Sequence, residues 1–94
     1  MNTKALSTLF ERMDVVCQSS GTYLAIIRPG KTGEVVEKLK SRARLKLKLG
    51  TALMKYEYAG ASITYVAPNR LVIRLRDSGS LEEVKALLSR LISD

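Results

Sequence analysis

The chain has no histidine and only one cysteine among its 94 residues. Ser-His and Cys-His nucleophilic pairs and histidine-based metal sites are therefore excluded, and one cysteine cannot build a thiolate zinc cluster. The carboxylates are scattered, and no pair has a spacing that suggests acid–base catalysis. The segment Pro29-Gly30-Lys31-Thr32 resembles the end of a phosphate-binding P-loop, but Ala25 stands where that pattern needs glycine. We expect a protein that is not an enzyme and that uses no metal or cofactor.

Long apolar runs are also missing. No stretch approaches the roughly 18 residues that a membrane span needs, so no membrane partner is expected. The start, Met1-Asn2-Thr3-Lys4, carries a single charge and leads into no uninterrupted apolar stretch, which is unlike a signal peptide. These features predict an intracellular, cytoplasmic protein. The lone Cys17 stands beside two valines and is expected to be a buried small hydrophobic residue rather than a reactive thiol.

The length leaves room for one domain over residues 1–94. A chain this short buries a limited fraction of its surface, so we expect a homo-oligomer, a dimer or a tetramer.

Acidic residues are scarce where basic residues are abundant. Residues 28–76 contain 12 basic and 3 acidic side chains, whereas the two ends together contain 4 basic and 6 acidic ones. Plentiful Lys, Arg and Glu also suit a thermophilic protein, but thermal robustness does not explain why the positive charge is segregated. A positive stretch of this kind is typical of a protein whose partner carries phosphates.

Hydrophobic spacing predicts three helices. The first covers residues 4–18 and is ended by Ser19-Ser20-Gly21. The second begins at Thr32, which can cap it, and ends near Ser41. The third begins with the capping box at Ser80 and continues with apolar residues at helical spacing as far as Ile92. The apolar positions of the three helices are Leu6, Leu9, Phe10, Met13 and Val16, then Val35, Val36, Leu39 and Ala43, then Val84, Leu87, Leu88, Leu91 and Ile92.

β-Branched, aromatic and alternating runs predict strands over residues 22–28, 42–49, 52–58, 62–67 and 70–76. In residues 38–48 every second residue is basic, so a strand separates the charges from the leucines, whereas a helix intermingles them. A continuous helix through Met54 is the alternative, because Ala, Leu, Lys and Met are good helix formers. The predicted fold is α+β, an antiparallel sheet of four to five strands with helices packed on one face, in the order α-β-α-β-β-β-β-α.

Short hairpin loops predict which strand residues lie opposite one another. Loops of Gly50-Thr51, Ala59-Gly60-Ala61 and Pro68-Asn69 place Lys46 opposite Lys55, Lys55 opposite Tyr65, and Tyr65 opposite Val72. One face is then predicted to be apolar and to pack against the helices, with Tyr56 and Tyr58 in the core and Tyr23 buried as well. The other face is predicted to be a nucleic-acid-binding surface composed of Arg42, Arg44, Lys46, Lys48, Leu53, Lys55, Ile63, Tyr65, Arg70, Val72, Arg74 and Arg76.

Apolar side chains among like charges are unfavourable on a bare sheet, but an anionic partner with apolar rings explains both features. Single-stranded nucleic acid is such a partner, because basic side chains follow its phosphates while bases pack on Tyr65 and its neighbours. Two alternatives remain open. One is an RNA-binding module, and the other is a protein-interaction subunit whose apolar strip is an oligomer interface.

The layout of helix, strand, helix, antiparallel meander and helix, with the basic run KLKSRARLKLK at residues 38–48, resembles the ThermoDBP proteins of thermophilic archaea. The resemblance covers most of the chain and is greatest to the shorter members of that family. It implies single-stranded DNA binding in a basic cleft over an apolar floor, carried onto the basic and apolar residues of the predicted surface. The longer members have a coiled-coil dimerisation tail, for which the sequence leaves no room before Asp94, so any oligomer is expected to use the surfaces of the domain itself.

Overall fold

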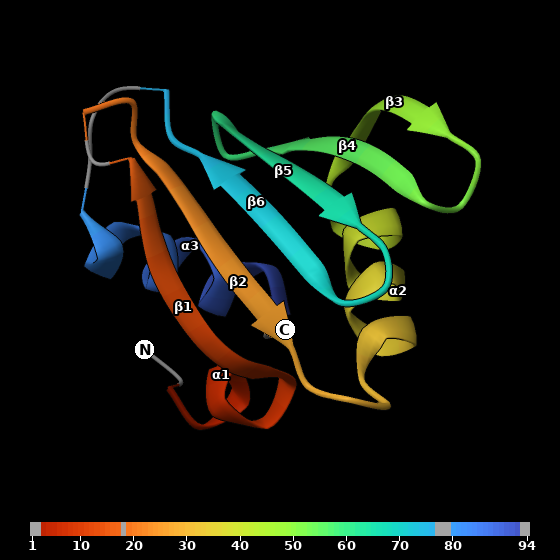
Figure 1. Cartoon of the computed structure of the whole chain (residues 1–94), viewed down its shortest axis with the longest axis horizontal. Helices are drawn as coiled ribbons and strands as arrows, with labels where there is room; N and C mark the ends of the chain where they lie inside the picture. Colours follow the sequence, from red (N-terminus) through yellow and green to blue (C-terminus); the bar gives the residue numbers. More distant parts are fainter. Residues whose placement is uncertain (1–2, 18, 77–79, 93–94) are drawn as a thin grey trace.

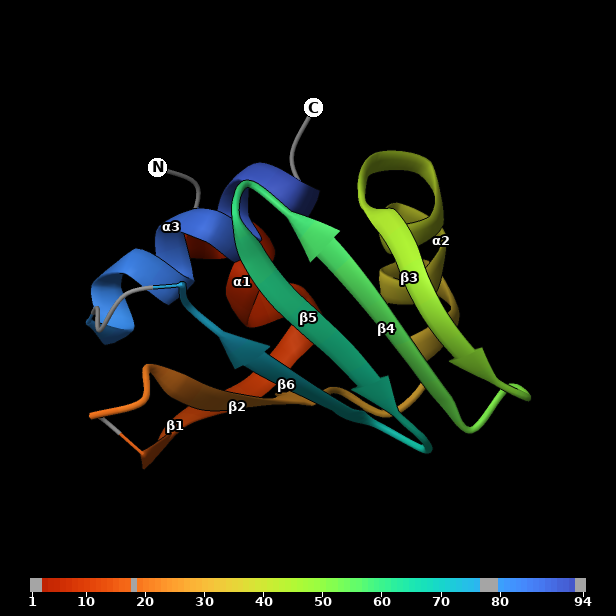
Figure 2. The same cartoon turned by 90° about the horizontal axis from the view of Figure 1, so that it is seen from above.

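The computed structural model describes residues 3–17, 19–76 and 80–92, and within them it contains three helices and six strands. The strands form one antiparallel sheet in the order β1-β2-β6-β5-β4-β3, and the helices lie on one face of it (Figures 1 and 2). The predicted α+β class is confirmed, with six strands instead of four to five. The elements are α1 (Thr3–Leu9), β1 (Phe10–Cys17), β2 (Thr22–Ile27), α2 (Thr32–Arg42), β3 (Arg44–Leu49), β4 (Leu53–Tyr58), β5 (Ala61–Val66), β6 (Arg70–Arg74) and α3 (Leu81–Ile92).

The first predicted helix is wrong in its second half. Helix α1 ends at Leu9, and the chain continues directly as strand β1, which pairs with β2. A bulge between Phe10 and Arg12 shifts the alternation by one residue, so Phe10 and Met13 both face the core although they are three residues apart. The bulge therefore gives the buried residues of this strand the three-residue spacing that is typical of a helix. Pairing of β1 with β2 also satisfies backbone N–H and C=O groups that β2 would otherwise expose at the edge of the sheet.

Helix α2 ends and strand β3 begins within two residues of the predicted positions. The last helical residue is Arg42, and the backbone of Ala43 is already extended, with its N–H donating to the Leu39 carbonyl. The alternative of a continuous helix through Met54 is therefore wrong. The predicted cap is also wrong, because Lys31 occupies the N-cap position and the Thr32 hydroxyl donates to the Pro68 carbonyl, 3.2 Å away.

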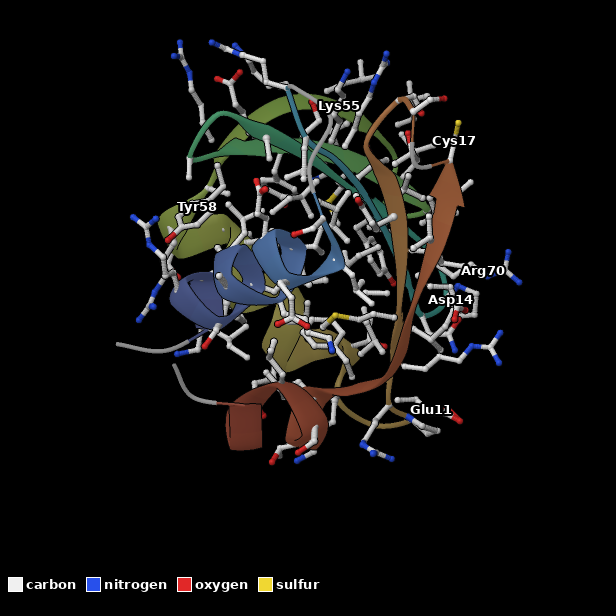
Figure 3. The ribbon with its side chains drawn as sticks, turned by 90° about the vertical axis from the view of Figure 1, so that its left-hand side faces the viewer. Glu11, Asp14, Cys17, Lys55, Tyr58 and Arg70 are labelled. Atoms are coloured by element: carbon white, nitrogen blue, oxygen red, sulfur yellow. The ribbon has the colours of Figure 1, made fainter. Side chains whose placement is uncertain are left out.

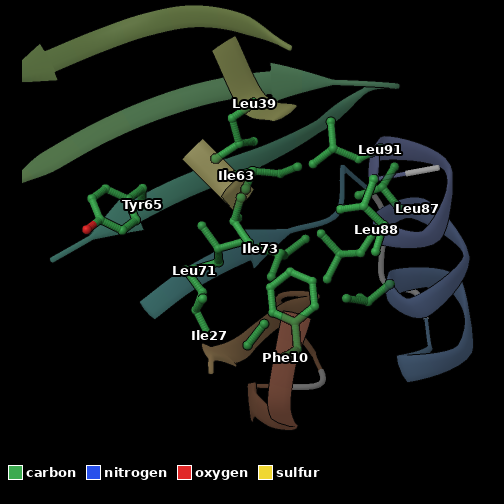
Figure 4. Packing of buried hydrophobic residues seen from close by; sticks show 14 of the residues in the cluster. Phe10, Ile27, Leu39, Ile63, Tyr65, Leu71, Ile73, Leu87, Leu88 and Leu91 are labelled. Carbon is green, nitrogen blue, oxygen red and sulfur yellow. The ribbon is translucent and has the colours of Figure 1, made fainter. Parts of the chain in front are cut away.

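Helix α3 is confirmed. The Ser80 hydroxyl oxygen accepts a hydrogen bond from the Glu83 backbone N–H at 3.3 Å, as expected of an N-terminal cap. All five residues of its predicted apolar stripe are buried. Figure 4 shows Leu87, Leu88 and Leu91 facing the sheet.

The core lies between the sheet and the helices. Tyr23 and Tyr56 are buried there as predicted, Tyr58 packs against its margin, and burial raises the pKa of the Tyr56 phenol. Figure 4 shows side chains from β5 and β6 meeting those of α2 and α3. Within the described part of the chain, none of the helices has the length and apolar character needed to cross a membrane.

Two register predictions are wrong by one residue each, and their errors cancel across β5. The β4–β5 loop is two residues long instead of three, so Tyr56, not Glu57, lies opposite Ile63. The β5–β6 loop is Ala67-Pro68-Asn69, with a cis peptide bond before Pro68. Strand β5 is therefore turned over relative to the prediction, whereas β6 keeps the predicted face. Tertiary burial explains the reversal, because Ala61, Ile63 and Tyr65 are more apolar than Ser62 and Thr64 between them.

Strand β3 also departs from its predicted register. Leu49 lies opposite Leu53, one residue out of step with the prediction, but a bulge between Leu45 and Leu47 restores Arg44 opposite Glu57. The two halves of β3 therefore present different residues to a given face. Beyond the bulge, Leu47 and Leu49 lie on the face that was predicted to carry only the basic side chains of this strand.

Candidate nucleic-acid interface

The sheet face away from the helices, termed the open face, is defined by the strand register. Residues opposite one another in neighbouring strands point to the same side, and their sequence neighbours point to the helix side. No helix of the described residues covers this face (Figure 2). Its members are Arg12, Asp14 and Cys17 of β1, Thr22, Leu24 and Ile26 of β2, Arg70, Val72 and Arg74 of β6, Ser62, Thr64 and Val66 of β5, Leu53, Lys55 and Glu57 of β4, and Arg44, Lys46, Leu47 and Leu49 of β3.

The open face is positively charged. Six basic and two acidic residues give it a formal charge of +4. Each acid lies near a base, with Arg12 Nε 3.0 Å from Asp14 Oδ2 and Lys46 Nζ 3.9 Å from Glu57 Oε1. Both pairs are largely exposed, so they contribute little to stability and leave the positive field of the face in place.

An apolar strip crosses the same face through five of the six strands. Its members on β2, β6, β5 and β4 are half-buried by their neighbours, and those on β3 are exposed. Neighbouring side chains contact these apolar residues from the sides, but none of the described residues packs over them. The apolar strip consists of Leu24, Ile26, Leu47, Leu49, Leu53, Val66 and Val72.

Seven of the twelve predicted surface residues lie together on the open face. They come from β3, β4 and β6, and the loop lengths predicted the correct side of the sheet for each of them. They are Arg44, Lys46, Leu53, Lys55, Arg70, Val72 and Arg74.

Ile63 and Tyr65 lie in the core, so their predicted exposure is wrong. Ile63 is fully buried, and Tyr65 is 6% exposed. The Tyr65 hydroxyl donates to the Pro68 carbonyl at 3.2 Å, which ties the ring to the β5–β6 turn. Among the described residues, no aromatic side chain lies on the open face, so a ring on which bases could stack is absent there.

Three predicted basic residues lie elsewhere. Lys48 lies opposite Met54 and therefore points to the helix side, where the bulge in β3 has turned it. Arg42 belongs to α2, and its Nη1 donates to the Leu91 carbonyl of α3 at 3.0 Å. Arg76 lies beyond the end of β6 and lines a small cavity with Glu83 and Leu87 of α3. These placements correct the predicted set.

The sequence reasoning missed five members of the apolar strip and one base. Leu24 and Ile26 belong to an apolar run, residues 23–27, that has no polar alternation, which is typical of a strand with apolar residues on both faces. Their place in the sheet depended on the pairing of β2 with β6, which no short hairpin loop indicates. Leu47 and Leu49 were predicted on the wrong side because of the bulge in β3, and Val66 because of the wrong register of β5. Arg12 was missed because its segment was predicted to be a helix.

Strand β3 is the most exposed part of the sheet. Leu45, Leu47 and Leu49 are 49%, 48% and 60% exposed, although they are large apolar residues. Leu45 points to the helix side and lines a cavity with Lys40 and Lys48, while the other two leucines point to the open side. The edge strand therefore carries exposed leucines on both of its faces, among basic residues.

Cys17 lies at one corner of the open face and is exposed, which overturns the predicted burial (Figure 3). Its sulfur lies 3.3 Å from the Ser19 hydroxyl, and hydrogen bonds from Ser19 and Ser20 lower the thiol pKa to about 7. In the same view Asp14 and Arg70 project from the open side, and Tyr58 lies on the helix side. The described residues contain no group of three or more carboxylates or thiols that could hold a metal ion.

Comparison of the chain with protein-family models, curated proteins and solved structures finds no match. The geometry and charge of the open face therefore carry the functional argument.

Proposed function

We propose that the open face binds single-stranded nucleic acid, DNA in preference to RNA, with little dependence on sequence. The observation that carries the proposal is the combination on one uncovered face of six basic side chains with a seven-residue apolar strip. The size of the chain and its basic run at residues 38–48 fit the resemblance to the ThermoDBP proteins, and under this proposal the chain shares their partner.

The apolar strip favours single strands over duplexes. A duplex presents phosphates outside and hides the faces of its bases, so it could use the charges of the open face but not the strip. A single strand exposes both groups, and its bases can lie against Leu24, Val72 and Val66 while phosphates approach Arg70 and Arg74. Because these side chains are aliphatic, each base should gain less than the roughly 1–3 kcal/mol measured for stacking on aromatic rings.

The first experiment compares labelled oligo-dT with a duplex of equal length by fluorescence anisotropy. We expect tighter binding of oligo-dT, and an affinity that falls as salt is raised. If about four phosphates are neutralised, the slope of log affinity against log salt should be about −3 for a single strand. Equal affinity for duplex and single strand, or an affinity independent of salt, would contradict the proposal.

Charge reversal on the two faces provides a matched pair of variants. Arg70→Glu with Arg74→Glu replaces two positive charges on the open face by two negative ones and should weaken oligo-dT binding on the order of a hundredfold. The control, Lys40→Glu with Arg90→Glu, makes the same change in net charge on the exposed side of α2 and α3. It should weaken binding by less than about threefold, because it leaves the open face intact.

RNA binding is a second candidate, since the same charges and strip serve either backbone. Competition between DNA and RNA oligonucleotides of the same length and sequence decides between them. A preference for RNA keeps the open face as the site and changes the partner.

The third candidate is a protein-interaction subunit, in which the apolar strip is buried against another protein and the charge is incidental. The exposure of the β3 leucines, which is about half or more of each side chain, favours it. Under this candidate Val72→Asp disrupts assembly, whereas Arg70→Glu with Arg74→Glu leaves it intact. Under nucleic-acid binding the paired arginine reversals abolish most of the affinity for oligo-dT.

A further inference from the structure

Strand β1 forms one edge of the sheet and combines a bare backbone with exposed apolar side chains. In the described residues only β2 pairs with it, and Val15 and Val16 are 50% and 60% exposed. Figure 3 looks at this side of the molecule, with Glu11, Asp14 and Cys17 labelled on β1. An unpaired edge of this kind is a template for another strand.

The charged residues of β1 are arranged so that two antiparallel copies of this strand are complementary in charge. Arg12 and Asp14 both lie on the open face, two residues apart, on either side of Met13. If a second β1 pairs antiparallel to the first with the two Met13 residues opposite, Arg12 of each copy lies opposite Asp14 of the other. Opposite charges across a strand pair stabilise it by roughly 0.2–1 kcal/mol each.

The neighbouring registers are disfavoured by the same residues. Centring the pair on Asp14 places two aspartates opposite each other, and centring it on Arg12 does the same with two arginines. Like charges at directly opposed positions are destabilising. One register is therefore selected by charge.

A cavity on the helix side of β1 adds a second, independent observation. It has a volume of about 310 Å³ and lies where α1, β1 and α3 meet. Met13 lines it, and Val15 lies on the same side of β1. In the pairing centred on Met13, the same side chains of the second copy lie next to the mouth of this cavity. Apolar surface that is exposed in one copy is thus covered by the other.

The opposite edge of the sheet lacks this complementarity. A second β3 would bring the three basic residues of each strand against those of the other copy, and no acidic residue lies within β3 to compensate. Edge lysines are a common device against such pairing. Of the two edges, only β1 suits a second copy of the chain.

We propose that two copies of this chain form a symmetric dimer by antiparallel pairing of their β1 strands, with Met13 on the two-fold axis. The axis is perpendicular to the sheet, so the two open faces lie on the same side and form one surface of twelve strands. At about 4.8 Å per strand this surface is roughly 58 Å wide. The bulges leave only residues 12–15 regular, so the interface is small and the dimer dissociates on dilution. The proposal does not depend on nucleic-acid binding.

Charge swapping tests the pairing by sedimentation equilibrium over a range of protein concentrations. The unchanged chain should approach twice the monomer mass of 10.4 kDa at high concentration. Arg12→Asp or Asp14→Arg alone should raise the dissociation constant roughly tenfold or more, and the two together should restore it, because the swapped pattern is again self-complementary. The control Glu37→Arg changes the net charge as Asp14→Arg does, but on exposed α2, and should have no effect.

Three outcomes would overturn the proposal. The first is a monomer even at millimolar protein, and the second is a dimer that neither single reversal weakens. The third is a double swap that fails to recover the dimer while its circular dichroism shows a native fold.

Cysteine cross-linking tests the register itself. In a Cys17→Ser background, Met13→Cys places two thiols directly opposite each other, and mild oxidation should give a covalent dimer. Val15→Cys is the matched control, because Val15 lies opposite Glu11 of the other copy and should cross-link much more slowly. Faster cross-linking at position 15 than at position 13 would refute this register.

Discussion

The two faces of the sheet are made by the same strands, yet they differ in what covers them. On the helix side, Ile63 and Ile73 are fully buried beneath α2 and α3. On the open side, their neighbours Thr64 and Val72 are only half-buried, and basic residues surround them. The helix side accordingly supplies most of the folding free energy, while apolar and basic groups on the open side stay in contact with solvent.

The largest difference between the faces is expected in stability. Ile63→Ala removes buried methyl groups from the centre of the core and should lower the free energy of unfolding by about 2–5 kcal/mol. Thr64→Ala, the next residue on the same strand, should change it by less than about 1 kcal/mol. Urea denaturation followed by circular dichroism measures both. Similar losses for the two variants would mean that β5 does not present Ile63 to the core.

The apolar strip offers a second contrast, now in binding. Val66→Ser shortens the strip on the open face and should weaken oligo-dT binding several-fold, because bases lose an apolar contact surface. Its effect on stability should stay near 1 kcal/mol, since the side chain is only half-buried. Anisotropy titration and urea denaturation of one sample give both numbers. A strong loss of stability with unchanged affinity would assign Val66 to folding alone.

Tyr65 tests the difference between the two faces, because its aromatic ring could stack on a base but faces the core. Tyr65→Phe removes the hydrogen bond to the Pro68 carbonyl and should lower the free energy of unfolding by about 0.5–1.5 kcal/mol. Affinity for oligo-dT should not change. A marked loss of affinity in the stably folded variant would show that the ring reaches the nucleic acid.

The smallest expected effect concerns Cys17 at the corner of the open face. Hydrogen bonds from Ser19 and Ser20 lower its pKa to about 7, so the thiolate fraction should rise as pH increases through that value. Iodoacetamide alkylation should show a midpoint near pH 7, and Ser19→Ala should move the midpoint upward. Bound oligo-dT should slow the reaction if the open face is the binding site. A midpoint at the ordinary thiol value would contradict the hydrogen-bonded geometry.

Most of the fold was predictable, and the site only in part. Helix α3 carries strong local signals, a cap at Ser80 and a long apolar stripe, and its predicted position is confirmed. In the basic run, alternation of charge and leucine located β3 correctly. By contrast, the bulge at Glu11 gave strand β1 the spacing of a helix, and no local rule distinguishes the two.

The loops explain why the predicted site was incomplete. A loop one residue shorter or longer reverses a whole strand, so small uncertainties in the turns at Gly60 and Pro68 moved Ile63 and Tyr65 from the surface to the core. Strand β6 kept its place because the two errors cancelled. The alternation of β5 itself, with Ser62 and Thr64 between apolar residues, was the signal that could have corrected the register.

The sequence by itself determined the α+β class, the excess of positive charge in residues 28–76 and the places of most helices and strands, because composition, periodicity and caps act locally. Only the tertiary structure decided which side chains share the open face. That choice depends on strand register, bulges and the pairing of β2 with β6, which join residues far apart in the chain and are settled by burial of the core. In the tertiary structure the predicted surface is still basic, but aliphatic side chains stand in place of the predicted tyrosine. The surface also includes residues of β2 and β1.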